Sequence, residues 1–322
     1  MEKIKQGYKQ TDIGVIPEDW EVKPIGKTLK IKHGKDQKKV LSNDGKYPIL
    51  GTGGLMGYAT NFLYSQESVL IGRKGTINKP MFMDKPFWTV DTLFYSEIKK
   101  GYLPKFIYYK FQMIDWYAYN EASGVPSLNA KTIEKIDIST PNNITEQTAI
   151  ATALSDTDAL IAALDKKIAK KQQIKQGAMQ QLLTGKKRLP GFSGEWVEKK
   201  LSQVALNIKT GKRNGEDNDL NGKYPFFVRS KNILRLNSYS FDGEAILIPG
   251  EGGIGTIFHY IYGKFDYHQR VYKISNFIDE SDGRFIFYYL KYFFGSYALQ
   301  NSVKATVDSL RLATFEEFMM II

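Results

Sequence analysis

An internal repeat restricts the fold of this chain more than any other feature of its sequence. Trp20 lies in the run Pro-Glu-Asp-Trp-Glu-Val, and Trp196 lies in the similar run Ser-Gly-Glu-Trp-Val-Glu, 176 positions later. The tetrapeptide Gly-Lys-Tyr-Pro occurs at 45–48 and again at 222–225, 177 positions later. Because the motifs return in the same order at nearly the same offset, the sequence predicts two domains of one kind.

The stretches between these landmarks indicate the fold class. The apolar run 69–72 before Gly-Thr-Ile at 75–77 corresponds to the run 246–248 before Gly-Thr-Ile at 255–257. In both halves short β-branched and aromatic runs alternate with glycine, a pattern typical of strands and turns in small α+β domains. We therefore expect an α+β protein with two repeated globular domains separated by a long coiled-coil-type helix.

The segment 143–189 is the one long stretch with a helical pattern. Asn143, followed three residues later by Glu146, has the spacing of a capping box at a helix start. Gly185 is typical of a residue that ends a helix, and Pro190 cannot continue one. At 1.5 Å per residue such a helix is about 60 Å long, too long to be buried in one small domain. The expected organisation is a first domain at 1–142, the helix at 143–189 and a second domain at 190–322.

The apolar residues of this helix recur about every 3.5 residues, which is the repeat of a coiled coil. Lys171 and Lys175 lie on the same line and favour an acidic partner helix there. The second half reaches Ile322 directly after its copy of 136–138, so we expect no second long helix in the chain to cover this line. Its apolar residues are predicted to dock on another copy of the chain or on a partner protein: Leu154, Ile161, Leu164 and Ile168.

The charge balance indicates the kind of partner. The formal net charge is +11 and the isoelectric point is about 9.3, which suits a polyanion. We expect nucleic acid rather than a membrane, because the sequence has no basic amphipathic helix and no apolar run of transmembrane length. The chain has no cysteine, and His33, His259 and His268 are too scattered to predict a zinc site. The first residues lack an apolar signal region, so we expect a cytoplasmic protein.

Lysines and arginines occur at matching places in the two halves. In the first half they lie in a polar loop at 35–39 and in a glycine turn at 73–79, and in the second half at 209–213 and 229–235. Cations on turns can reach phosphates or the O6/N7 edge of guanine, whereas cations on helix faces are more often solvated. The candidate DNA-binding residues are Lys35, Lys38, Lys39, Arg73, Lys74, Lys79, Lys209, Lys212, Arg213, Arg229, Lys231 and Arg235.

Two sequence patterns that occur in enzymes are also present, but each is weaker evidence than the basic loops. Gly250–Gly255 satisfies G-x-G-x-x-G, but a β-like aromatic run follows it where a dinucleotide site requires a helix. Asp91, Glu97 and Lys99 have the residue types of a metal-dependent nuclease, although the second half lacks carboxylates at the corresponding place. A self-sufficient nuclease is therefore one alternative function. A coiled-coil adaptor that binds RNA or protein is another.

The order of the motifs around the long helix resembles the specificity subunits of type I restriction-modification systems. The resemblance rests on Gly14–Trp20, Tyr47-Pro48, Pro141 followed by Thr145-Glu146-Gln147, and Gly191–Trp196. It implies two target-recognition domains, each reading one half of a split site in double-stranded DNA, and a helix that docks the modification subunits. It also implies a non-catalytic chain without its own cofactor. S-adenosylmethionine, ATP and magnesium would belong to the partner methyltransferase and restriction/translocase subunits. Such subunits usually close with a second long helix, for which the sequence up to Ile322 has no counterpart.

Overall fold

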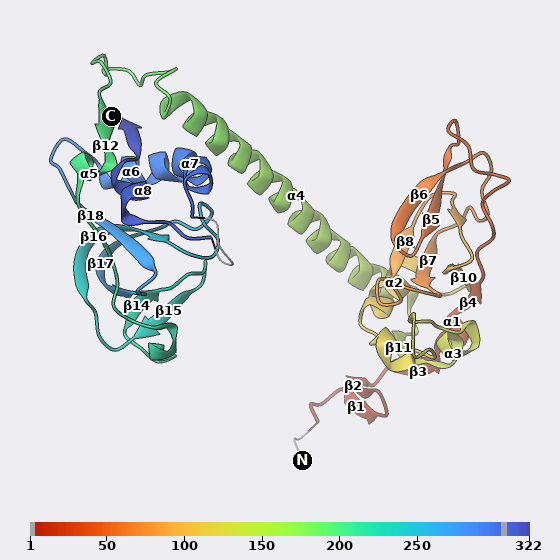
Figure 1. Ribbon diagram of the computed structural model, residues 1–322. Coiled ribbons are helices and arrows are strands. Elements are labelled where there is room, and N and C mark those ends of the chain that lie inside the picture. The colour runs from red at the N-terminus through yellow and green to blue at the C-terminus, as the bar shows by residue number, and fades with distance from the viewer. Residues whose placement is uncertain (1–3, 304–307) are drawn as a thin grey trace. The chain divides into compact units, whose positions relative to one another are not determined.

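The chain folds into two compact units that share one long helix. The computed structural model describes residues 4–303 and 308–322. Unit 1 ends at Asp165 and unit 2 begins at Lys166. This boundary falls inside helix α4 (Ile144–Leu182), so the helix contributes its first part to unit 1 and its last part to unit 2 (Figure 1).

Unit 1 is built mainly from short strands, as its β-branched and aromatic runs predict. The strands are β1 (Tyr8–Thr11), β2 (Gly14–Pro17), β3 (Trp20–Pro24), β4 (Leu29–Lys32), β5 (Tyr47–Gly51), β6 (Gly54–Ala59), β7 (Ser68–Gly72), β8 (Met81–Met83), β9 (Trp88–Thr89), β10 (Leu93–Ile98) and β11 (Asp137–Pro141). The main sheet has four strands in the order β4-β10-β7-β8, and a three-stranded sheet has the order β6-β5-β9. Strand β1 pairs with β2, and β3 pairs with β11.

The core of unit 1 forms where a helix covers the main sheet. All five residues of β7 are buried. Helix α2 (Pro104–Gln112) has proline in its first turn, where a missing N–H does no harm, and it buries Phe106, Ile107 and Phe111. These side chains share one apolar cluster with Ile71 of β7 and Phe94 of β10. The remaining helices are α1 (Ile25–Thr28), η1 (Trp116–Tyr119) and α3 (Ala130–Lys135).

Unit 2 has one larger sheet. Its strands are β12 (Glu198–Lys200), β13 (Ala205–Thr210), β14 (Tyr224–Phe227), β15 (Ile233–Leu236), β16 (Phe241–Pro249), β17 (His259–Tyr267), β18 (Val271–Phe277) and β19 (Met319–Ile321). Six of them form a sheet in the order β13-β18-β16-β17-β14-β15, and β12 pairs with β19. The helical segments are α5 (Leu201–Val204), η2 (Gly215–Asp217), α6 (Gly283–Tyr289), the π-helix η3 (Leu290–Phe294), α7 (Gly295–Gln300) and α8 (Leu312–Glu316).

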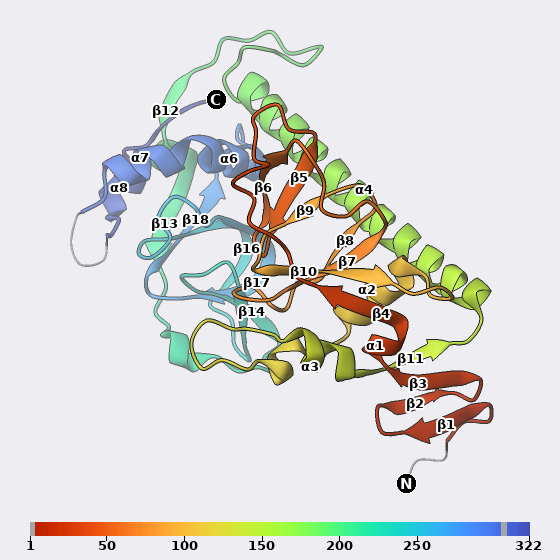
Figure 2. The same cartoon turned by 90° about the vertical axis from the view of Figure 1, so that its right-hand side faces the viewer.

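Helices α6, α7 and α8 gather at one end of strands β13, β16 and β18 (Figure 2). They contribute Ile286, Phe294 and Phe315 to an apolar cluster that also contains Ile246 and Ile274 of the sheet. A helix-covered sheet is thus the core of each unit, and the predicted α+β class is confirmed.

The structure confirms the repeat in its tertiary contacts. The ring of Trp20 meets the ring of Phe106 edge-on, with centroids 6.3 Å apart and an interplanar angle of 75°. The ring of Trp196 meets that of Phe285 with centroids 6.1 Å apart and an angle of 71°. Both tryptophans lie in the first repeated motif, and both phenylalanines lie in the helix that covers the main sheet.

Two equivalent glycines allow a close approach of backbone segments. A Cβ atom at Gly34 would lie 1.9 Å from the carbonyl oxygen of Val90, and one at Gly211 would lie 1.9 Å from that of Tyr267. No side chain fits at either place without a backbone shift. The two glycines are 177 positions apart, which is also the offset between the two Gly-Lys-Tyr-Pro motifs.

Helix α4 differs from its sequence-based prediction at both ends. It ends at Leu182, so the predicted helix at 143–189 is too long. Gly185 has φ +69 and stops the helix as predicted, and Lys187 N–H donates to the Gln181 carbonyl at 3.1 Å. At the start, Asn143 Oδ1 accepts from Thr145 N–H at 2.8 Å, which is an N-cap bond.

The predicted capping box is wrong in its second half. Glu146 Oε1 accepts a hydrogen bond from the indole N–H of Trp20 at 2.9 Å. A tertiary donor has therefore engaged the carboxylate that the local pattern assigned to the backbone of Asn143.

The first turns of α4 are fastened to unit 1 by polar contacts. Gln147 is fully buried, and its side-chain amide accepts from Leu103 N–H at 2.9 Å and donates to the Pro141 carbonyl at 3.1 Å. About three turns further on, Tyr109 Oη donates to Asp158 Oδ2 at 2.7 Å. The helix then becomes exposed. Over residues 4–303 and 308–322, no helix combines the length and the apolar character that a bilayer span requires.

Candidate nucleic-acid interface

The predicted cations of unit 1 gather at one end of its main sheet. Strands β4 and β7 both pair antiparallel with β10, so they are parallel to each other and the segments that follow them leave at the same end. Lys35 follows β4, and its N–H donates to the Thr89 carbonyl at 2.8 Å. Arg73 follows β7, and its N–H donates to the Thr92 carbonyl at 2.8 Å. Both loops are thereby held against the segment that leads into β10.

The side chains at this end are largely available for binding. The Arg73 Nη1 atom donates to the Asp91 carbonyl at 3.3 Å, which leaves most of its five N–H donors unused by that contact. Five further cations predicted for this unit are exposed: Lys35, Lys38, Lys39, Lys74 and Lys79. The structure therefore brings these cations together in one cluster of loops.

The equivalent end of unit 2 carries arginines that are held by carboxylates. Strands β13 and β16 both pair antiparallel with β18, as their counterparts do in unit 1. Arg213 Nε lies 3.4 Å from Oδ2 of the buried Asp266, whose other oxygen accepts from Ser240 Oγ at 2.6 Å. Arg229 forms an ion pair with Glu251. Lys212 and Lys231 are exposed in the adjoining loops.

Two of the predicted residues do not lie on loops. Lys209 belongs to β13 and pairs in register with Lys273 of β18. Arg235 belongs to β15, and its guanidinium donates to the carbonyls of Gly222 at 2.7 Å and Lys223 at 3.2 Å. The expectation that these cations lie on turns is therefore wrong for both, because the strands extend further than the glycine pattern indicates.

Sequence reasoning did not include Arg270 and Glu251. Arg270 lies in the turn between β17 and β18, and its Nη1 atom is 3.4 Å from Glu251 Oε1. Its position just before β18 corresponds to that of Thr92 before β10, and because threonine carries no charge the repeat gave no signal for a cation there. His268 lies in the same turn, and its pKa is lowered by burial first and then by the positive charges of Arg229 and Arg270.

The alternative nuclease site is not assembled. Asp91 precedes β10 whereas Glu97 lies near its other end, a separation of about 20 Å along an extended strand. Glu97 pairs instead with Lys32 at 3.1 Å, and Lys99 Nζ donates to the carbonyl of Gly26. Within the part of the chain that the structure describes, no group of three His, Cys, Asp or Glu side chains could hold a metal ion.

The glycine motif at 250–255 also lacks its required context. It is followed by turn and extended backbone, and the next element is strand β17. The last glycine of the motif, Gly255, has φ +70 and approaches the backbone of Gly295 closely. These glycines therefore serve a tight turn against α7, and the helix that a dinucleotide site requires does not follow them.

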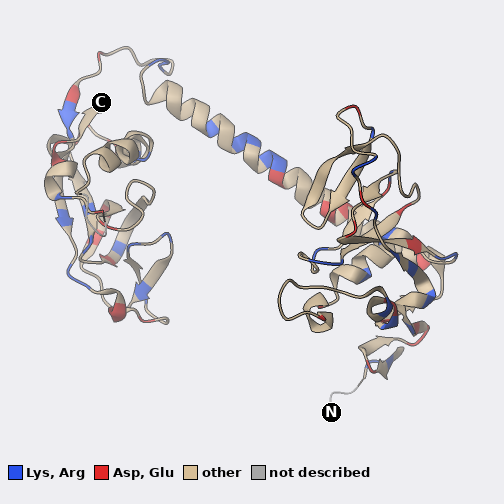
Figure 3. Ribbon diagram, turned by 45° about the vertical axis from the view of Figure 1, so that its right-hand side comes forward, with Lys and Arg blue, Asp and Glu red and all other residues tan. Residues whose placement is uncertain are grey.

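The predicted docking residues of α4 are accessible. The exposed fractions are 41% for Leu154, 53% for Ile161, 48% for Leu164 and 54% for Ile168. Several lysines also lie along this part of the helix (Figure 3). Lys175 was predicted to lie on the same line of the helix and to face a partner helix. That prediction is wrong, because its Nζ atom lies 5.2 Å from the ring centroid of Tyr288 in unit 2.

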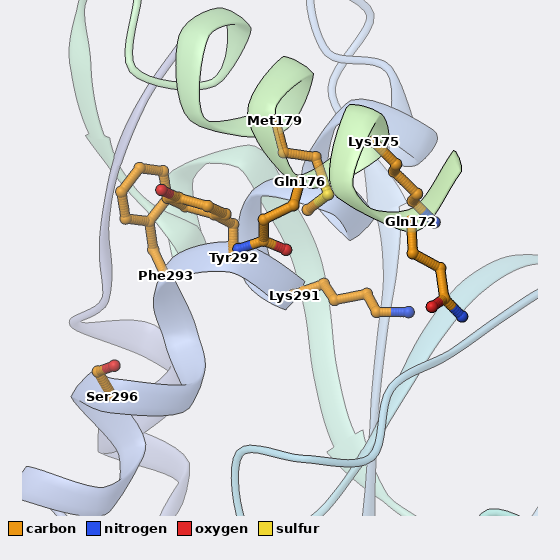
Figure 4. A pocket seen from close by; sticks show the side chains of 8 residues that line it. All are labelled: Gln172, Lys175, Gln176, Met179, Lys291, Tyr292, Phe293 and Ser296. Carbon is orange, nitrogen blue, oxygen red and sulfur yellow. The ribbon is translucent and has the colours of Figure 1, made fainter. Parts of the chain in front are cut away.

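A groove of about 620 Å³ lies between the last turns of α4 and η3 within unit 2. Figure 4 shows Gln176 and Met179 of α4 on one side and Tyr292 on the other, and Lys175 and Lys291 also line the groove. This groove marks where the end of the helix rests on its domain.

Each of the two like units thus carries cations at an equivalent sheet end, and clustered lysine and arginine are the electrostatic footprint of a surface that binds nucleic acid. The profile of the type I restriction modification DNA specificity domain matches residues 17–176 and 193–322. Since these segments make up most of the sequence, the chain belongs to this family.

Two curated relatives are specificity subunits. The chain is 27% identical over 237 residues to the type I restriction enzyme MjaVIII specificity subunit of Methanocaldococcus jannaschii, covering 65% of the chain and 55% of the relative. It is 35% identical over 81 residues to the EcoDI specificity subunit of Escherichia coli, covering 25% of the chain and 18% of the relative. The chain thus spans about half the length of the first relative and less of the second.

Solved structures share the fold. The S subunit of a type I restriction-modification system from M. genitalium superposes with a TM-score of 0.74 at 17% identity, over 99% of this chain and 86% of the other. A structure concerned with complex assembly and conformational transition of the type I system gives a TM-score of 0.51 at 12% identity, over 95% and 86%. The repeated two-unit architecture is therefore that of known specificity subunits.

Proposed function

We propose that this chain is the DNA-recognition component of a type I restriction-modification assembly. Each unit binds one half of a bipartite site in double-stranded DNA, and α4 sets the separation of the two halves. Methyl transfer from S-adenosylmethionine, and ATP- and magnesium-dependent translocation with cleavage, belong to partner subunits. The chain itself contributes recognition and not catalysis.

The observation that carries this proposal is the duplication of a basic sheet end. In both units the segments after two parallel strands meet the segment that leads into the strand between them, and both sets carry lysine and arginine. Lysines provide charge for phosphates, and the planar fork of arginine can also recognise guanine. Two such surfaces on one chain suit a target read in two parts.

The spacing of the half-sites tests this function. Sites selected from random duplexes are resynthesised with one base pair added to or removed from the spacer, and binding is measured by gel shift. We expect affinity to fall by at least about tenfold with either change, because one unit then loses its base contacts. Binding that ignores the spacer would contradict a bipartite target. A second comparison uses Lys74→Ala at the sheet end of unit 1. Its control is Lys167→Ala on the exposed middle of α4, which removes the same charge away from the proposed interface.

We infer further that Leu154, Ile161, Leu164 and Ile168 dock on the modification subunit or on a second copy of the chain. Their line runs along the exposed part of α4, where four large apolar side chains at a 3.5-residue repeat form a coiled-coil seam. Light scattering of the chain with and without modification subunits tests this. Ile161→Asp is expected to abolish association, whereas Leu160→Asp, at a similarly exposed position off the seam, retains it. A strictly monomeric chain that also ignores the modification subunit would overturn this inference.

A further inference from the structure

A carboxylate lies between two arginines at the basic end of unit 2. Glu251 Oε2 is 3.3 Å from Arg229 Nη1, and Glu251 Oε1 is 3.4 Å from Arg270 Nη1. The Glu251 side chain is 22% exposed, whereas those of Arg229 and Arg270 are 48% and 56% exposed. The carboxylate is therefore the enclosed member of the cluster, and both guanidinium groups keep access to solvent.

The backbone on either side of this cluster is fixed. Gly250 N–H donates to the Arg270 carbonyl at 2.8 Å, and Leu310 N–H donates to the Gly250 carbonyl at 2.8 Å. Arg270 N–H in turn donates to His268 Nδ1 at 3.0 Å. Arg229 comes from a different part of the sheet, after β14. The carboxylate thus joins two segments and restricts two long side chains that would otherwise move freely.

The charge of the cluster distinguishes between two kinds of DNA contact. Each guanidinium has five N–H donors, and one nitrogen of each faces the carboxylate, so donors remain on both arginines. A phosphate at those donors would lie close to the negative charge of Glu251, which would weaken its attraction to the two arginines. The edge of guanine is neutral and offers O6 and N7 as a pair of acceptors to the arginine fork. The arrangement therefore favours base recognition over phosphate binding.

Unit 1 carries the opposite charge at the same place. Glu251 forms a β-bridge with Ser309, and Lys74 forms the corresponding bridge with Ser127. A lysine beside Arg73 suits a phosphate, because it adds positive charge where unit 2 has a carboxylate. The two sheet ends are thus equivalent in backbone but different in chemistry.

We propose, building on the DNA-recognition function above, that Glu251 is a positioning residue that holds Arg229 and Arg270 for reading guanine in the half-site bound by unit 2. Pre-ordering of the two arginines reduces the conformational entropy that binding has to overcome. The carboxylate also disfavours sites that would offer these arginines only phosphates.

The test selects duplexes from a random library with the full chain, alone and together with type I modification subunits, and sequences the bound fraction. Wild type is expected to give a bipartite motif with guanine in the half-site of unit 2. Glu251→Gln is expected to reduce discrimination for guanine in that half-site about tenfold while binding to unrelated duplex becomes tighter. Arg229→Lys keeps the charge without the fork and is expected to lose the same preference. Glu317→Gln, which removes an ion pair with Lys200 elsewhere in unit 2, leaves the motif unchanged.

The outcomes separate this proposal from the function it builds on. If wild type selects a motif in two halves and both Glu251→Gln and Arg229→Lys leave it intact, the role of Glu251 is overturned. The DNA-recognition function then still stands. Wild-type protein that selects no bipartite motif overturns both. The half-site read by unit 1 is an internal control, and the melting temperature reports on folding. A variant that merely unfolds unit 2 lowers the melting temperature, whereas a positioning defect changes the motif at an unchanged melting temperature.

Discussion

The indole N–H of Trp20 donates to Oε1 of Glu146 at 2.9 Å and so joins the first strand of the repeat to the first turn of α4. The two residues are far apart in sequence, and the ring of Trp20 also meets Phe106 of helix α2. The contact thus connects the start of the helix to the core of unit 1. A negative charge near a helix N-terminus is favourable as well, so the carboxylate has two roles.

Replacing Trp20 with phenylalanine should destabilise the start of α4. The substitution keeps an aromatic ring and removes the donor, which should cost about 1–2 kcal/mol because the acceptor is a charged carboxylate. Denaturant unfolding measures this cost, and hydrogen exchange of the amides at 144–151 localises it. Among the described residues Trp196 donates no hydrogen bond from its indole, so Trp196→Phe is the matched control with a smaller effect. Equal effects of the two substitutions would contradict this role of the hydrogen bond.

Gln147 should tolerate substitution poorly. Its buried amide accepts from Leu103 N–H and donates to the carbonyls of Pro141 and Gly101, so Gln147→Leu leaves three backbone groups without that partner. Each unsatisfied buried group costs about 1–3 kcal/mol, and we expect a loss of at least about 2 kcal/mol in the free energy of unfolding. Gln173→Leu, at an exposed site of the same helix, should change it by less than about 0.5 kcal/mol. Similar stabilities of the two variants would show that the amide does not fasten the helix.

The equivalent glycines Gly34 and Gly211 predict a pair of matched defects. Alanine at either position places Cβ 1.9 Å from a carbonyl oxygen, and the resulting backbone shift should destabilise the affected unit by about 2 kcal/mol or more. Gly177→Ala is the opposite case, because Gly177 lies within α4 and its Cβ would meet no atom within 4 Å. That substitution should stabilise the helix by up to about 1 kcal/mol. Thermal unfolding followed by circular dichroism measures all three, and a tolerated Gly211→Ala would contradict the close approach.

The repeat made the fold predictable, because motifs such as the Trp20 and Trp196 runs recur in order and imply two similar cores. The long helix was predictable from its 3.5-residue apolar repeat. What failed was local reasoning about residues with distant partners. The capping box assigned Glu146 to its own helix, although the closest donor comes from Trp20.

The same limitation affected the candidate interface. Arg235 was predicted to lie on a turn, but it belongs to strand β15. Its guanidinium donates to two backbone carbonyls. Glu251 and Arg270 were missed because their significance depends on an ion pair between two segments that no spacing rule connects. Sequence patterns indicated strands and turns, whereas the exact ends of the strands and the charge relations at those ends depend on the sheet.

A buried lysine in unit 2 predicts a pH dependence of stability. Lys273 is 4% exposed, and its Nζ atom lies 3.6 Å from the ring centroid of Phe241. Burial first, and then the charge of Lys209, lower the pKa of Lys273 from an ordinary value of 10.5 to about 8. The folded state therefore releases this proton at a lower pH than the unfolded chain does.

Between about pH 8 and 10.5 the unfolded chain binds more protons at this site, so the contribution of Lys273 to the free energy of unfolding rises with pH across that window. Below about pH 8 both states are protonated, and the destabilisation is present in full. Lys273→Met should therefore raise the free energy of unfolding at pH 7 by about 1–3 kcal/mol, with part of the gain offset by the lost contact to Phe241. Its advantage over wild type should shrink steadily as the pH approaches 10. Denaturant unfolding at pH 7, 8, 9 and 10 measures both chains, and the difference between them removes the titration of the other lysines and tyrosines. Parallel curves for wild type and Lys273→Met would mean that Lys273 is hydrated in the folded state and that its charge costs unit 2 nothing.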